Sequence, residues 1–69
     1  MITPNNNRLA LADDHVVQGR RIVGRQRQLI SALRARSVDS GNAEDLLRAF
    51  EQTLAIFEDD LAEIAARER

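Results

Sequence analysis

The chain has 69 residues, of which 43% are hydrophobic and 30% are charged, a composition typical of one small folded domain. It has no cysteine, which excludes a disulfide framework and a cysteine-ligated zinc site. Its net charge of −1 predicts no general attraction to nucleic acid, and the lack of a long apolar run predicts no membrane span and no signal peptide, so we expect a cytoplasmic protein.

The small net charge conceals two halves of opposite sign. Residues 1–36 contain seven arginines and two aspartates, a balance of +5, whereas residues 37–69 contain three arginines and nine acidic residues, a balance of −6. Neither half is low in apolar residues, so neither has the composition of a disordered charged tail. We therefore expect both halves to fold and to carry their charges on structured surfaces.

The first helix is predicted over residues 8–36. Residues 1–7 show no periodicity and are expected to be a flexible N-terminal segment, although Thr3 and Pro4 would also suit a cap and a first helical residue. From residue 9 onward, core-type positions recur at alternating steps of three and four, the spacing of helices that pack side by side. These positions are Leu9, Ala12, Val16, Gly19, Val23, Gln26, Ile30 and Leu33.

Small polar residues interrupt this pattern at 37–41, where we expect a turn, and the second helix is predicted over 42–67 with Ser40 or Asn42 as its cap. A connection this short makes the two helices antiparallel neighbours. The predicted fold is therefore all-α, an antiparallel, coiled-coil-like two-helix hairpin. The core positions of the second helix are Ala43, Leu47, Phe50, Leu54, Phe57, Leu61 and Ile64.

The charges test the register of this hairpin. Each helix carries a row of charges seven residues apart along one edge, arginine on the first and glutamate on the second. Exposed ion pairs contribute only about 0.2–1 kcal/mol each, so they select the register more than they stabilise the fold. Folding about the turn pairs Arg34 with Glu44, Arg27 with Glu51 and Arg20 with Glu58. The same fold predicts core layers of Leu33 with Leu47, Ile30 with Phe50, Gln26 with Leu54, Val23 with Phe57, Gly19 with Leu61 and Val16 with Ile64.

The opposite edge of the predicted hairpin is apolar. Two helices have no third surface to cover it, and small chains without disulfide or metal usually need oligomerisation or very good helix packing. We predict a homodimer that forms a four-helix bundle, and the alternatives are an unidentified protein partner, a higher oligomer or a monomer. We name this edge the apolar flank; it consists of Ile22, Leu29, Leu46, Thr53 and Ile56, with Ala32 and Ala49 beside them.

Several runs of the sequence resemble short uncharacterised bacterial helical-hairpin proteins. Residues 14–23 (DHVVQGRRIV) and 25–30 (RQRQLI) are similar to their first helix, and residues 43–47 (AEDLL) and 50–54 (FEQTL) to their second. The similarity covers residues 9–57, although members often have glycine and a histidine-aspartate-threonine turn where this chain has SVDS at 37–40. The resemblance implies a helical hairpin and a bacterial origin. The family has no assigned activity, so no functional residue is carried over.

His15 is the only histidine, and the predicted register places it opposite Asp60, with Asp59 and Glu63 nearby. These residue types could ligate a metal ion, but the Glu-x-x-His spacing of carboxylate-bridged bundles is absent. We therefore favour a hydrogen-bonded pair of His15 and Asp60 and expect neither a metal nor a cofactor.

The arginines of the first half suggest a phosphate-binding stripe, but three of them are matched by glutamates and no aromatic side chain is expected to stack on bases. Arg21 and Arg25 remain unmatched, and nucleic acid is not the expected partner. No hydroxyl nucleophile stands beside His15, so we expect no enzymatic activity. The predicted function is a non-enzymatic protein–protein interaction or scaffold module. The alternatives are a nucleic-acid-associated regulator that uses the unmatched arginines and, less favoured, a metal- or ligand-binding helical bundle.

Overall fold

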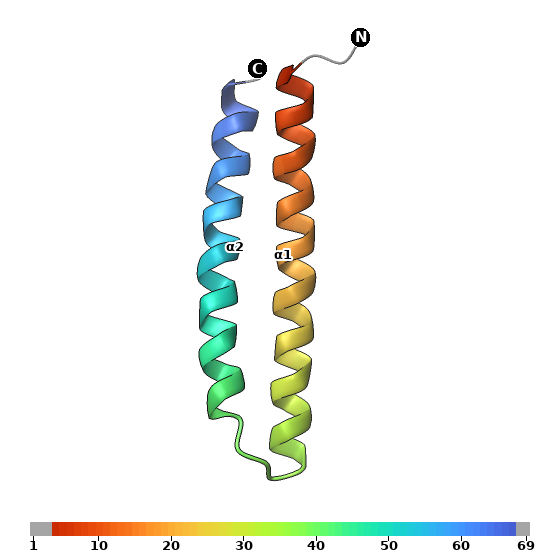
Figure 1. Cartoon of the computed structure of the whole chain (residues 1–69), viewed down its shortest axis with the longest axis vertical. Coiled ribbons are helices and arrows are strands. Elements are labelled where there is room, and N and C mark those ends of the chain that lie inside the picture. The colour runs from red at the N-terminus through yellow and green to blue at the C-terminus, as the bar shows by residue number, and fades with distance from the viewer. Residues whose placement is uncertain (1–3, 68–69) are drawn as a thin grey trace.

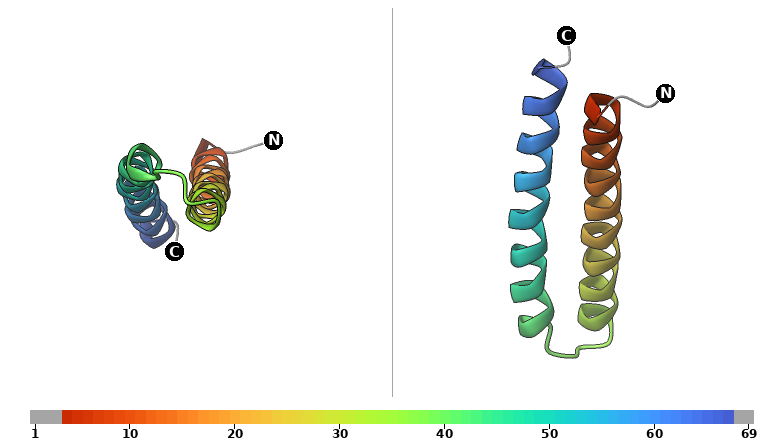
Figure 2. Two further views of the ribbon diagram at one scale, coloured as in Figure 1. Left: turned by 90° about the horizontal axis from the view of Figure 1, so that it is seen from below. Right: turned by 45° about the horizontal axis from the view of Figure 1, so that its top comes forward.

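The computed structural model describes residues 4–67, with side chains from Asn7 onward. Helix α1 spans Pro4–Ala35 and helix α2 spans Gly41–Arg67, and a short loop joins them (Figure 1). The two helices run antiparallel and side by side (Figure 2). The start of α1 and the end of α2 therefore lie together, at the end of the hairpin opposite the loop. The predicted all-α helical hairpin is therefore confirmed, and residues 4–67 contain no strand.

Helix α1 begins at Pro4, four residues before the predicted start at residue 8. Residues 4–7, expected to belong to an N-terminal segment outside the helix, are therefore part of α1, and residues 1–3 lie outside the described part of the chain. Proline suits the first turn of a helix because its missing N–H would have no intrahelical partner there. The other three helix boundaries differ from the predicted ones by one residue at most.

The C-terminus of α1 is closed by a Schellman motif. The N–H of Val38 donates to the carbonyl of Leu33 at 2.8 Å, and the N–H of Ser37 donates to the carbonyl of Arg34 at 3.0 Å. Ser37 has a φ of 56°, in the left-handed region that this motif requires. These bonds satisfy carbonyls that the helix end would leave unpaired and turn the chain toward α2.

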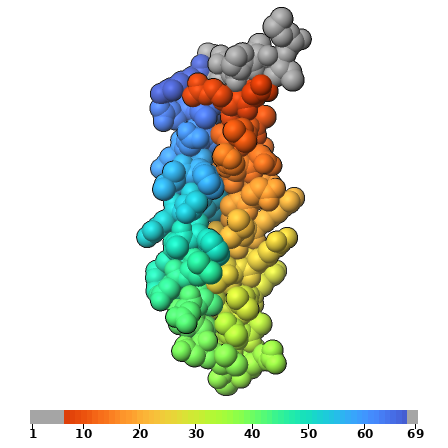
Figure 3. Space-filling view, in the orientation of Figure 1, coloured from red at the N-terminus to blue at the C-terminus, as the bar shows by residue number. Residues whose placement is uncertain are grey.

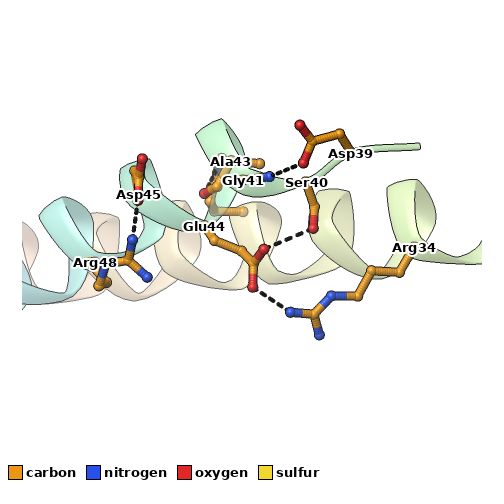
Figure 4. A network of polar contacts seen from close by, with 9 residues as sticks. Arg34, Asp39, Ser40, Gly41, Ala43, Glu44, Asp45 and Arg48 are labelled. Atoms are coloured by element: carbon orange, nitrogen blue, oxygen red, sulfur yellow. Dashed lines mark hydrogen bonds and ion pairs between the residues drawn. The ribbon is translucent and has the colours of Figure 1, made fainter. Parts of the chain in front are cut away.

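Helix α2 begins with its own cap. The carbonyl of Ser40 accepts the first helical hydrogen bond, from the N–H of Glu44 at 2.8 Å, so Ser40 rather than Asn42 occupies the cap position. The N–H of Gly41 donates to the carboxylate of Asp39 at 2.9 Å, which satisfies another donor of the first turn (Figure 4).

The two helices share their core unequally. The core positions of α1 between residues 12 and 30 are small, β-branched or polar, and all are buried, whereas the large side chains of α2 are only half-buried. A single neighbouring helix cannot cover the wide apolar stripe of α2. The buried positions of α1 are Ala12, Val16, Gly19, Val23, Gln26 and Ile30; the half-buried ones of α2 are Leu47, Phe50, Leu54, Phe57 and Leu61.

The predicted core layers are displaced. A β-carbon on Gly19 would lie 3.0 Å from Leu54 Cδ1 and 3.6 Å from Phe57 Cδ2, so Gly19 faces these residues rather than Leu61. Gln26, expected beside Leu54, instead donates its side-chain amide to the carbonyl of Ala43 at 2.9 Å. Because the core positions repeat every seven residues, a core residue of α1 can face either of two α2 residues that are one heptad apart. An arginine side chain is long enough to form its ion pair with either choice of core partner.

The hairpin is elongated, with principal extents of 54, 19 and 14 Å. Its radius of gyration is 15.9 Å, whereas a compact domain of 69 residues has about 11 Å. On the face seen in Figure 3, the side chains of the two helices meet along the hairpin. Every core residue therefore lies close to a surface.

Candidate interaction surface

One edge of the hairpin is a row of ion pairs, as the sequence predicted. Arg20 bonds to Glu58 at 3.2 Å, Arg27 to Glu51 at 2.8 Å and Arg34 to Glu44 at 2.5 Å. All of these side chains remain substantially exposed to solvent, so solvent screens each pair and its contribution to stability is small. The row fixes which charged side chains pair along this edge, while the heights of the two backbones follow from the core contacts.

Glu44 belongs to a polar network at the loop end (Figure 4). Its carboxylate accepts the Ser40 hydroxyl at 2.9 Å as well as the guanidinium of Arg34. The Ser40 hydrogen bond, followed by the hydrogen bond and charge of Arg34, holds the pKa of Glu44 below its ordinary value of 4.5. The first turn of α2 also carries the partial positive charge of the helix dipole, which suits a carboxylate there.

Other arginines are arranged differently on the two helices. On α2, Arg48 bonds to Asp45 and Arg67 bonds to Glu63, so both described arginines of this helix are paired within it. On α1, Arg21 and Arg25 are exposed and form no ion pair with any residue of the described part. The two arginines for which the sequence offered no facing glutamate thus also lack an ion pair in the described part of the hairpin.

The apolar flank is exposed. Its four large side chains, Ile22, Leu29, Leu46 and Ile56, keep 43%, 47%, 46% and 66% of their surface accessible, and Thr53 is also exposed. The Thr53 hydroxyl donates to the carbonyl of Ala49 at 3.1 Å, which satisfies it within α2 and leaves its methyl group for contacts. Exposed apolar side chains that follow one another along two helices are typical of an interaction site.

A shallow groove of about 100 Å³ lies on the same side of the hairpin. Ile22 and Thr53 of the flank both line it, which shows that the flank residues of the two helices converge. Its floor is formed where Gly19 lacks a side chain against Leu54 and Phe57. The ring of His15 closes one end and lies 5.0 Å from the ring of Phe57, centroid to centroid, at an interplanar angle of 30°.

His15 does not form the predicted hydrogen bond with Asp60. Both residues line a second, more polar groove of about 220 Å³ with Leu11, but the described structure shows no hydrogen bond between them, and the ring of His15 lies against that of Phe57. The ring gains more by covering the half-buried Phe57 than by reaching an exposed carboxylate that water solvates well. Residues 4–67 hold no group of three histidine and acidic side chains that could bind a metal ion.

Two parts of this surface were missed by sequence reasoning. Leu11 is 58% exposed and lies one helical turn before His15, so it extends the apolar residues toward the open end of the hairpin. The groove was also missed, although Gly19 on the core face of a helix was a signal that something approaches closely there.

Comparisons with models of protein families, with curated proteins and with solved structures find no match to this chain. Neither helix of the described part combines the length and the apolar character needed to cross a membrane. The function is therefore argued from the geometry of the hairpin.

Proposed function

We propose that this protein is a non-enzymatic interaction module that self-associates through its apolar flank into a four-helix bundle. The observation that carries the proposal is the exposure of four large apolar side chains on one side, over a row of half-buried core residues on α2. A second copy laid on the flank would cover both sets at once.

The surface area of the chain supports the proposal. Its accessible surface is 5383 Å², about 1,000 Å² more than the roughly 4,400 Å² expected for a compact monomer of 7.8 kDa. The face that carries the flank is about 54 Å long and 19 Å wide, which is large enough for the roughly 800 Å² per partner of a standard interface. Self-association would therefore bring the exposed surface per chain to an ordinary value.

The proposal predicts that a charge on the flank dissociates the assembly. Ile22→Glu or Leu29→Glu would place a carboxylate in the apolar interface, and we expect the dimer affinity to fall by about 100-fold or more, because burying an unpaired charge costs several kcal/mol. Analytical ultracentrifugation over a range of concentrations measures this: the unchanged chain sediments as a dimer and the variants as monomers.

Val17→Glu is the matched control. Val17 is a β-branched residue of the same helix that is 37% exposed, but it lies among charged residues on the outer side, away from the flank. It should leave the sedimenting mass unchanged. A monomeric unchanged chain, or flank variants with the same mass as the unchanged chain, would contradict the proposal.

A further inference from the structure

We infer that the two copies associate with their loops at the same end, so that each α1 packs against the α2 of the other copy. This inference rests on the proposed self-association and concerns the orientation of the copies. Two identical flanks can meet about a two-fold axis that runs along the helices or about one that runs across them. The first places both loops at one end, and the second places them at opposite ends. Both leave every helix antiparallel to its neighbours, so the choice depends on which side chains meet.

The charges of the two helices favour the same-end arrangement. Helix α1 carries six arginines and two aspartates, a balance of +4, whereas α2 carries two arginines and seven acidic residues, a balance of −5. In the same-end dimer, each basic α1 lies between two acidic helices, its own α2 and that of the partner. In the opposite-end dimer, α1 lies against α1 and α2 against α2, which places like charges side by side.

Arg25 adds a local reason. It follows Ile22 by three residues and precedes Leu29 by four, so it lies on the α1 edge of the flank, where it is exposed and has no ion pair among the described residues. An opposite-end dimer centred on the apolar residues brings Arg25 against its own copy. In the same-end dimer it lies instead against the partner's α2, close to the level of Ala49, because the contact of Gly19 with Leu54 and Phe57 sets these heights.

The groove fits the same arrangement. The contact of Gly19 with Leu54 and Phe57 places Ile56 close to the height of Gly19, and a two-fold axis along the helices preserves heights between the copies. The partner's Ile56 then lies beside Gln18 and Ile22 at the α1 edge of the groove. Ile56 is 66% exposed, more than any other large hydrophobic side chain of the described part, and it has the most surface to bury there.

The opposite-end arrangement cannot bring Ile56 to the groove without a mismatch elsewhere. For Ile56 to keep its place at the groove, the axis would have to cross the flank at the height of Ile56 itself, and Leu46 would then face the last turn of the partner's α2. That turn carries the ion pair of Glu63 with Arg67, which an apolar side chain would desolvate. The same-end dimer instead places Leu46 close to the level of Leu29 of the partner's α1, so apolar residues meet apolar residues.

Spin labels on single cysteines test the orientation. The chain has no native cysteine, so Val38→Cys in the loop and Ala66→Cys near the other end of the hairpin each provide one exposed attachment point. Neighbouring helices of a bundle lie about 8–10 Å apart, so the same-end dimer should give distances within about 30 Å for both Val38→Cys with itself and Ala66→Cys with itself. A mixture of the two labelled chains should add a distance of roughly 40–45 Å, because Ala66 follows the start of α2 at Gly41 by 25 residues at about 1.5 Å each.

The outcomes separate this inference from the proposed function. A long distance for each self-pair and a short one for the mixed pair would overturn the same-end orientation and leave self-association standing. No intermolecular distance, together with a monomeric mass in the ultracentrifuge, would overturn both. Adding Ile22→Glu to each labelled chain is the control, because it should abolish all of these distances at once.

The salt dependence of the association gives a second test. Attraction between α1 and the partner's α2 is screened by salt, so the dissociation constant of the same-end dimer should rise several-fold between about 20 mM and about 300 mM NaCl. Like charges face each other in the opposite-end dimer, and its dissociation constant should fall over the same range. A fall would therefore overturn the inference.

Discussion

Ser37 occupies a backbone conformation that suits glycine. Its φ of 56° lies in the left-handed region, which costs an L-residue roughly 1–2 kcal/mol, and its N–H nevertheless closes the Schellman motif on Arg34. No hydrogen bond from its hydroxyl is seen in the described structure, so the side chain does not offset the free-energy cost of the left-handed conformation.

Ser37→Gly should therefore stabilise the hairpin by about 0.5–1 kcal/mol, the backbone strain relieved less the extra entropy that glycine loses on folding. Urea unfolding followed by circular dichroism at one protein concentration measures the change. Ser37→Ala, which keeps the strained backbone and removes the hydroxyl, is the control and should be close to neutral. Equal effects of the two substitutions would show that the left-handed conformation is not the cause.

Glu44 links the loop to the edge of ion pairs. The Ser40 hydroxyl and Arg34 hold its pKa below the ordinary 4.5, so the folded state favours the ionised carboxylate. A group whose pKa is lowered by folding contributes stability above its unfolded pKa, and that contribution is lost as the pH falls through the folded pKa.

Glu44→Gln should consequently reduce the stability at pH 7, and the difference from the unchanged chain should shrink as the pH falls below about 4.5. Unfolding curves collected from pH 7 to about pH 3 measure this difference. In an Arg34→Gln background the pH-dependent part should be smaller, because the hydrogen bond and the charge of Arg34 no longer lower the pKa of Glu44. A difference that stays constant down to the lowest pH would refute the role assigned to the carboxylate.

At the scale of the element, α1 is a helix with two interior glycines in different surroundings. A β-carbon on Gly19 would meet Leu54 Cδ1 at 3.0 Å, tighter than an ordinary contact, whereas a β-carbon on Gly24 would meet nothing within 4 Å. Each glycine costs the helix about 1 kcal/mol relative to alanine. Only Gly19 has a packing reason to be there, and nothing in the structure explains Gly24.

Gly24→Ala should thus stabilise the hairpin by about 1 kcal/mol, and Gly19→Ala should give no such gain because Leu54 must move to admit the methyl group. The paired measurement is thermal or urea unfolding of both variants at the same protein concentration. Equal stabilisation by the two substitutions would mean that α2 can shift away from Gly19 without cost.

The two elements also differ in what they leave exposed. Small and β-branched residues of α1 are covered by α2, but the leucines and phenylalanines of α2 are wider than the surface that α1 offers. Gln26 is buried among them and still finds a partner in the carbonyl of Ala43, so its amide does not oppose the packing. The uncovered surface of this element pair is therefore apolar rather than polar.

At the scale of the whole molecule, the hairpin exposes more surface area than a compact monomer of its mass. Its length, its radius of gyration and its excess accessible area all follow from packing only two helices, which leaves a core one side chain deep. The dissociation predicted for Ile22→Glu and the label distances belong to this scale, because they measure whether and how a second copy completes the core.

Much of the hairpin could be predicted because its pattern is local and repetitive. The spacing of Val16, Val23 and Ile30 defines a helix without any tertiary information, and SVDS at 37–40 marks the only place where the chain can turn. The start at Pro4 was misplaced because the first turn of a helix need not contribute to the core, so it carries no periodic signal.

The sequence by itself determined the two helices, the turn and the ion pairs of Arg20, Arg27 and Arg34, since the short turn and the equal spacing of the two rows bring each arginine to one glutamate. The tertiary structure decided which residues face each other across the core, because a heptad repeat is equally satisfied by two choices. It also decided that His15 covers Phe57 rather than bonding to Asp60, and that Gly19 leaves a groove. These outcomes depend on the relative sizes of side chains in three dimensions, which spacing along the chain does not contain.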